Sequence, residues 1–161
     1  SKTATKNIRE GLRLAMPDDP RQLNSLHCFV RSELLEVFCL GEEVPRRVGF
    51  RCVHCGHLPR KDRSGTSMGT FFPKSLEDIY RGVCTWQRIH FRSCQYIPQE
   101  VSEKYDYLKD ADRSRGKKPH WVKSAYRMGL RDADNKRGGI FWNPDDDHDD
   151  DDGVGEVDLI I

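Results

Sequence analysis

The chain has 161 residues, of which 36% are apolar and 33% are charged, and its formal net charge is +1. This size and composition predict one globular domain with tails and a modest core. No apolar run approaches the roughly 18–20 residues of a membrane span, and no charged-then-apolar leader is seen, so we expect neither a membrane partner nor a secretory signal.

Charge is divided unevenly along the chain. Residues 145–161 contain nine acidic residues and no Lys or Arg, so the remainder has a formal charge of +10. The Asp-rich segment cannot bury apolar surface and is predicted to be disordered. We therefore expect a flexible lead at 1–18, a basic domain at 19–144 and an acidic disordered tail at 145–161. A basic body is typical of nucleic-acid contact, and the tail is a candidate competitor for its basic face.

The first half of the domain is predicted to be a long helix followed by two strands. A helix over 20–40 is expected because Pro20 suits a first helical position, Gly41 suits a left-handed stop, and apolar residues recur at helical spacing. Those apolar residues are Leu26, Phe29, Val30, Leu34, Val37 and Phe38. A short strand is expected at 48–52, a polar basic loop at 57–69 and a returning strand at 70–72.

The second half is predicted to be mainly helical. The clearest helix covers 75–94, with Ser75 as N-cap and acidic residues in the first turn, where the helix dipole favours them. Further helices are expected at 99–112 and 119–129, and a short strand at 140–142. Residues 119–142 also fit the end of a winged-helix unit, with the strand as its wing.

Four side chains have the types and spacing of a metal site. Cys52 and Cys55 are separated by two residues in the turn that follows the first predicted strand. His90 and Cys94 are four residues apart, so they would lie on one face of the predicted helix. Together they complete a tetrahedral Cys3His zinc site, for which His57 is a substitute ligand. Reduced core cysteines beside a packed histidine, or disulfides, remain open as alternatives.

A site with four protein ligands leaves no position for water, so this pattern predicts a structural metal and not a catalytic one. Cys28, Cys39 and Cys84 are interpreted as buried thiols. We find no glycine-rich phosphate loop, nucleophile elbow or paired-carboxylate motif, so we expect neither an enzyme nor a small-molecule substrate. The predicted fold is α+β: a small zinc-stabilised strand–loop–strand–helix unit with flanking helices.

The Cys-x2-Cys and His-x3-Cys layout resembles the C2HC zinc fingers, loosely BED-like, of chromatin proteins and transposase relatives. The stretches LNSLHCFVRSELLEVF, VGFRCVHCG, FFPKSLEDIY, RIHFRSC and HWVKSAYRMGL resemble a module of uncharacterised diatom and related algal proteins, over roughly residues 20–142. The resemblance implies that Zn²⁺ is held by Cys52, Cys55, His90 and Cys94.

Basic residues cluster in the loop and on the predicted helices. Arg81, Arg88 and Arg92 recur at intervals of seven and four residues, which places them on one helix face able to follow a phosphate backbone or enter a major groove. The full candidate nucleic-acid-binding set is Arg60, Lys61, Arg63, Arg81, Arg88, Arg92, Lys117 and Lys118.

We therefore expect a zinc-finger binding module that contacts nucleic acid, in the nucleus or elsewhere inside the cell. DNA is favoured over RNA because the docking element is a helix. The alternatives are a protein-interaction or chromatin-reader module, and a structural accessory domain whose basic face is simply solvated.

Overall fold

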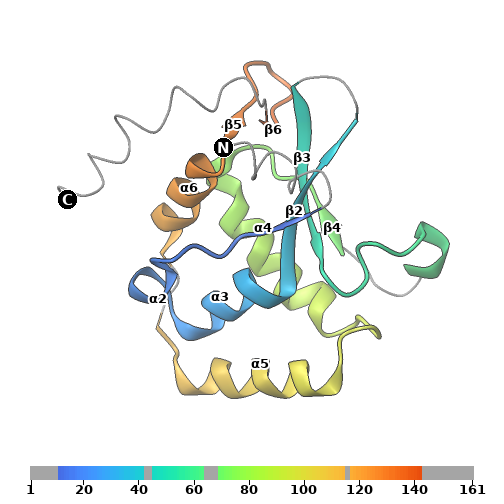
Figure 1. The fold of residues 1–161 in the computed structure, drawn as a ribbon, viewed down its shortest axis with the longest axis vertical. Coiled ribbons are helices and arrows are strands. Elements are labelled where there is room, and N and C mark those ends of the chain that lie inside the picture. The colour runs from blue at the N-terminus through green and yellow to red at the C-terminus, as the bar shows by residue number, and fades with distance from the viewer. Residues whose placement is uncertain (1–10, 42–44, 64–68, 115–116, 143–161) are drawn as a thin grey trace.

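The computed structural model describes residues 11–41, 45–63, 69–114 and 117–142. It contains a six-stranded antiparallel sheet with helices packed around it, so the α+β class is confirmed (Figure 1). The acidic tail predicted at 145–161 lies outside the described residues, as do residues 1–10 of the predicted lead. Within the described ranges, none of the helices combines the length and the apolar character that a membrane span requires.

The sheet is built around β3. Strand order is β1-β2-β3-β6-β5, and β4 also pairs with β3. One edge of β3 pairs with the whole of β2, while its other edge is shared by β6 near the start and β4 near the end. The strands are β1 (Leu12–Arg13), β2 (Leu35–Leu40), β3 (Arg46–Cys52), β4 (Thr70–Phe71), β5 (Leu130–Asp132) and β6 (Ile140–Trp142).

Helical segments precede, follow and interrupt the sheet. The α-helices are α2 (Asp19–Gln22), α3 (Ser25–Phe29), α4 (Ile79–Trp86), α5 (Gln99–Ala111) and α6 (Lys118–Arg127). The 3-10 turns are η2 (Arg60–Arg63) and η3 (Leu76–Asp78), and the π-helical segments are η1 (Val30–Leu34) and η4 (Gln87–Phe91). The helices predicted at 99–112 and 119–129 therefore form, each ending one or two residues early.

The helix predicted over 20–40 is wrong in its second half. The chain is helical as far as Leu34 and then becomes β2, which pairs with β3 from residue 35 to residue 40. A short apolar run fits a buried strand as well as a helix, and pairing with a neighbouring strand decides between them. The apolar stripe itself is buried as predicted. Gly41 has a positive φ of 84°, but it ends a strand and not a helix.

Part of the predicted flexible lead belongs to the sheet. β1 pairs with Glu36 and Val37 of β2, and the next residue, Leu14, is only 2% exposed. Leu14 also donates its backbone N–H to the carbonyl of Arg31, at 3.2 Å. Residues 11–18 are therefore part of the folded domain.

The predicted helix at 75–94 forms in three pieces, η3, α4 and η4. Ile79, Val83 and Trp86 are fully buried against the sheet, as the apolar pattern predicts. The N-terminus is capped differently from the prediction, because Asp132 of β5 accepts the N–H of Leu76 at 2.7 Å. The hairpin of β5 and β6 thus joins the main sheet and the start of this helix, and it is not a wing.

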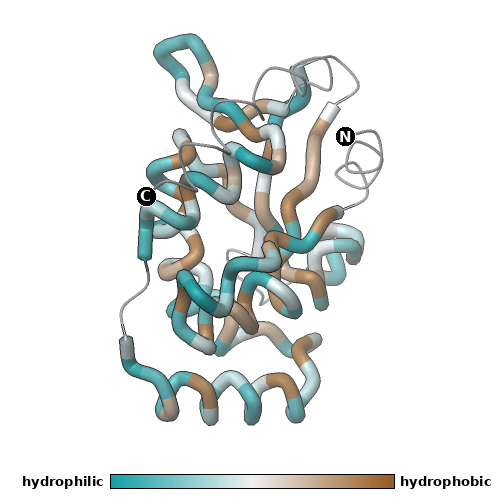
Figure 2. Tube along the Cα trace, turned by 60° about the vertical axis from the view of Figure 1, so that its left-hand side comes forward, coloured by the Kyte–Doolittle hydropathy of each residue, from teal (hydrophilic) through white to brown (hydrophobic). Residues whose placement is uncertain are grey.

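The layers leave α5 at one end of the molecule, where it packs on α3 (Figure 1). Figure 2 shows that the turn between β5 and β6 is hydrophilic. Along α5, apolar and polar residues alternate. Only one residue of α5, Tyr105, is buried. The helix therefore covers α3 and the end of η4 with one side and leaves the other side to solvent.

Candidate metal centre

The four predicted ligands come together in the core. The Sγ atoms of Cys52, Cys55 and Cys94 and a ring nitrogen of His90 all lie within 4.8 Å of one another, and all four residues are buried. In a tetrahedral zinc site, bonds of about 2.3 Å to sulfur and about 2.0 Å to nitrogen put donor atoms about 3.5–3.8 Å apart. The distance from Cys55 Sγ to His90 Nε2 is 3.6 Å. The cluster therefore has a geometry that can hold a metal ion.

The first two ligands lie on a tight turn at the end of β3. Cys52 is the last strand residue, and its N–H donates to the carbonyl of Gly69 at 2.8 Å. The N–H of Gly56 donates back to the carbonyl of Cys52, also at 2.8 Å, and closes the turn. A Cβ on Gly56 would lie 2.5 Å from that carbonyl oxygen, so only glycine fits there. The turn thus directs the thiols of Cys52 and Cys55 to the same side.

The other two ligands approach from η4, but not as an α-helical pair. His90 lies in the π-helical segment, and Cys94 lies beyond the end of the helix. The N–H groups of Ser93 and Cys94 both donate to the carbonyl of His90, at 2.9 and 3.0 Å. This terminal turn brings Cys94 back toward His90, so the predicted convergence is correct although the predicted helix geometry is not.

Apolar groups surround the cluster. Trp86, which is fully buried, places its ring 5.4 Å from the His90 ring, centroid to centroid. Gly69, which directly precedes β4, lies against the His90 ring and Cys55 on another side of the cluster. Burial of this kind excludes water and leaves the four donor atoms as the polar groups available to an ion.

Two of the thiols have opposite pKa shifts. Hydrogen bonding to Cys55 and Cys94, together with burial, raises the pKa of Cys52. Hydrogen bonds from Cys52 and Cys55 outweigh burial and lower the pKa of Cys94. The cluster therefore stabilises a thiolate at Cys94, which is the form that binds metal.

The competing ligands and pairings do not occur. His57 is exposed and its Nε2 lies 2.6 Å from Glu36 Oε2, so it is not a fourth ligand. All six cysteines lie in the described ranges and are free thiols, so the disulfide alternative is wrong. Cys28, Cys39 and Cys84 lie outside the cluster and are partly buried.

A second group of potential ligands, Asp18, Asp19 and His120, is better explained as an ion-pair network. Asp19 accepts hydrogen bonds from Arg31 Nε at 2.8 Å and His120 Nε2 at 2.7 Å. Asp18 pairs with Arg127 at 3.2 Å. Because these carboxylates are already occupied by cations, they do not form a metal site. This network was not predicted from the sequence, because its members are up to 109 residues apart.

The predicted nucleic-acid-binding residues do not form one surface. Arg81 of α4, Arg88 of η4 and Arg92, directly after η4, are each exposed. By contrast, η2, which contains Arg60, Lys61 and Arg63, lies on the opposite side of the molecule from the start of α6, which contains Lys118 and follows Lys117 (Figure 1). Lys118 pairs with Glu77 at 3.3 Å, and Arg92 pairs with Asp106 at 2.9 Å.

Gly69→Ala is expected to weaken metal binding. An added Cβ would lie 2.9 Å from His90 Cε1 and 3.2 Å from Cys55 Sγ, so both ligands would have to move. Overpacking of this kind costs about 1–3 kcal/mol, and titration against a chromophoric chelator would measure the loss as reduced metal affinity. Gly41→Ala is the control, because it introduces backbone strain in open space and should leave affinity unchanged. Wild-type affinity in Gly69→Ala would contradict the expectation.

Comparison of the chain with protein-family models, with curated proteins and with solved structures found no match. The resemblance to C2HC fingers therefore stays a prediction.

Proposed function

We propose that the protein is a binding module stabilised by one structural zinc ion at Cys52, Cys55, His90 and Cys94. Three thiolates and one imidazole are soft and borderline ligands of the kind that select zinc, and four protein donors fill a tetrahedral shell. The burial of all four supports a structural role, because such a site leaves no open position for substrate. The ion would tie the end of β3 to the end of η4.

We further propose that the module binds nucleic acid, with DNA favoured, through the exposed face of α4 and η4. The observation that carries this proposal is the exposure of Arg81 and Arg88, which lie seven residues apart on α4 and η4. Within the described residues neither arginine has an ion-pair partner. Solvated cations of this kind can neutralise phosphates, and the formal charge of +10 outside the acidic tail favours the same partner.

Duplex DNA affinity measured by fluorescence anisotropy over a range of salt concentrations tests this. In the double variant Arg81→Gln/Arg88→Gln, the slope of log K against log salt is expected to become shallower by about 2, because about one counterion is released per phosphate contact. The double variant Lys136→Gln/Arg137→Gln removes the same charge from the exposed turn between β5 and β6 and should keep the wild-type slope.

Two results would count against nucleic-acid binding: no measurable duplex affinity at low salt, or equal slopes in both double variants. In either case, binding of acidic or basic tail peptides would favour the protein-interaction alternative. That alternative has no specific structural observation behind it beyond the same basic face.

A further inference from the structure

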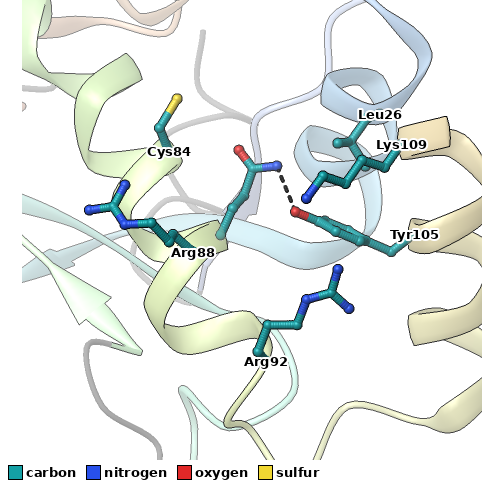
Figure 3. A pocket seen from close by; sticks show the side chains of 7 residues that line it. Leu26, Cys84, Arg88, Arg92, Tyr105 and Lys109 are labelled. Atoms are coloured by element: carbon teal, nitrogen blue, oxygen red, sulfur yellow. Dashed lines mark hydrogen bonds between the residues drawn. The ribbon is translucent and has the colours of Figure 1, made fainter. Parts of the chain in front are cut away.

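A groove of about 360 Å³ lies between the α4–η4 helix and α5, and Leu26 of α3 also lines it. This volume is at the lower end of the range for small-ligand sites. The polar side chains that line it come from both sides: Cys84 from α4, Gln87 and Arg88 from η4, Arg92 directly after η4, and Tyr105 and Lys109 from α5. Figure 3 shows these side chains around the space between the two helices.

The lining is strongly positive. It contains three cationic side chains, Arg88, Arg92 and Lys109, and no carboxylate. Asp106 offsets one of them by pairing with Arg92, whereas Arg88 and Lys109 have no ion-pair partner in the described part of the chain. Burial raises the pKa of the Cys84 thiol, which therefore stays neutral and adds no negative charge. Lys109 is therefore the uncompensated cation at the α5 side of the groove, and Arg88 adds a second at the side of Cys84.

A buried hydroxyl donor faces these cations. Tyr105 is only 3% exposed, and its ring is stacked on Phe91 with the centroids 4.0 Å apart. The Tyr105 oxygen accepts a hydrogen bond from Gln87 Nε2 at 3.0 Å, which leaves its own O–H hydrogen without an acceptor among the described residues. In Figure 3, Lys109 and Arg92 approach this hydroxyl from opposite sides, while Arg88 lies toward Cys84.

We propose that this groove is a binding site for a phosphomonoester. Such a group is close to a dianion at neutral pH and has three strong acceptor oxygens. Lys109, Arg92 and the Tyr105 hydroxyl supply three converging donors, and the excess charge of the groove matches that of the dianion. Phosphates inside a nucleic-acid strand are monoanionic diesters, so this site goes beyond the backbone contacts proposed above and does not depend on them.

Calorimetric titration of the zinc-loaded full chain with inorganic phosphate tests the site. Lys109→Gln and Tyr105→Phe are each expected to weaken phosphate binding by about tenfold, because each removes a hydrogen bond to a charged group. Lys136→Gln removes the same charge at an exposed position outside the groove and should bind as the wild type does. If wild-type protein fails to bind phosphate at millimolar concentration, or if the groove variants match Lys136→Gln, the proposal is overturned.

The source of the phosphate is identified with two further probes. A nucleoside 5′-monophosphate that binds in a Lys109-dependent manner, without competition from oligonucleotides, indicates a small phosphorylated molecule. A single-stranded oligonucleotide that binds about tenfold better with a 5′-phosphate than with a 5′-hydroxyl, and loses that preference in Lys109→Gln, indicates a chain end. Both results support the groove. Arg81→Gln lies outside it, so that variant affects duplex binding alone and separates the two proposals.

Discussion

Cys52→Ser and Cys94→Ser are each expected to lose the metal and most of the fold. Structural zinc binding supplies an apparent free energy of about 10–16 kcal/mol in zinc-finger peptides. The free energy of unfolding of a whole domain is only about 5–15 kcal/mol. Elemental analysis should find one zinc per chain in the wild type and none in either variant, and circular dichroism should show loss of cooperative melting. A strong chelator should have the same effect on the wild-type protein.

The size of this effect follows from where the ligands lie. Cys52 ends the central strand of the sheet, and Cys94 follows the helix that covers it, so the ion would join the two layers across a long loop. Without it, three buried thiols and a fully buried imidazole would face one another with no ion between them. Closing the loop and neutralising these buried groups are contributions that are both lost with the ion.

Matched substitutions outside the cluster separate metal loss from general thiol loss. Cys28→Ser and Cys84→Ser exchange the same atoms at partly buried positions, and each should retain one zinc per chain and a cooperative transition. A wild-type protein that contains no metal, or a Cys52→Ser variant that melts as the wild type does, would rule out the structural-zinc proposal.

The ligands could be predicted because each pair is local in the sequence. Two residues between Cys52 and Cys55 fit a tight turn, and three between His90 and Cys94 fit a single helical turn, whatever the rest of the chain does. Pro119, which suits the start of a helix, helped to locate α6 in the same way. The spacing did not, however, predict that η4 is π-helical. A π-helical segment contains one extra residue per turn, and this insertion does not visibly change the apolar pattern of the sequence.

The pairing of the strands could not be predicted from local sequence patterns. Residues 35–40 are apolar and short enough to be either helix or strand, and only their alignment beside β3 makes them β2. Similarly, Leu12 and Arg13 have no strong pattern of their own, and they form β1 because β2 offers a free edge. Contacts between residues far apart in the sequence decided both outcomes.

The buried ion-pair network shows the same limit for charged residues. Arg31 is fully buried, although arginine is rarely found in a core without a partner. Its partner Asp19 directly precedes Pro20, the predicted first residue of the helix, and His120, 101 residues after Asp19, completes the network. The network joins α2, η1 and α6, so its disruption should lower the free energy of unfolding of the whole domain.

Asp19→Asn is expected to destabilise the domain by about 3–5 kcal/mol, the cost of leaving one member of a buried pair without its partner. Arg31 would keep its hydrogen bond to the Leu14 carbonyl, at 2.8 Å, but lose the carboxylate 2.8 Å from its Nε. Asp18→Asn is the matched control, because Asp18 pairs with Arg127 nearer the surface and such pairs contribute at most about 1 kcal/mol. Denaturant unfolding at pH 7 would measure both differences, and equal losses would contradict the role given to Asp19.

The pH dependence of that difference gives the sharper test. Burial alone would raise the pKa of Asp19, but hydrogen bonds from Arg31 and His120 outweigh burial and hold it below the ordinary value of 3.8. The carboxylate therefore stabilises the fold fully above that value, and its contribution disappears as the pH falls through the lowered pKa of the folded state. Acid also releases zinc, but it does so in both proteins, so the difference between wild type and Asp19→Asn isolates the carboxylate. This difference should shrink as the pH falls below about 4, where Asp19 of the wild type becomes protonated. If it does not shrink there, Asp19 is not held as the ionised partner of Arg31.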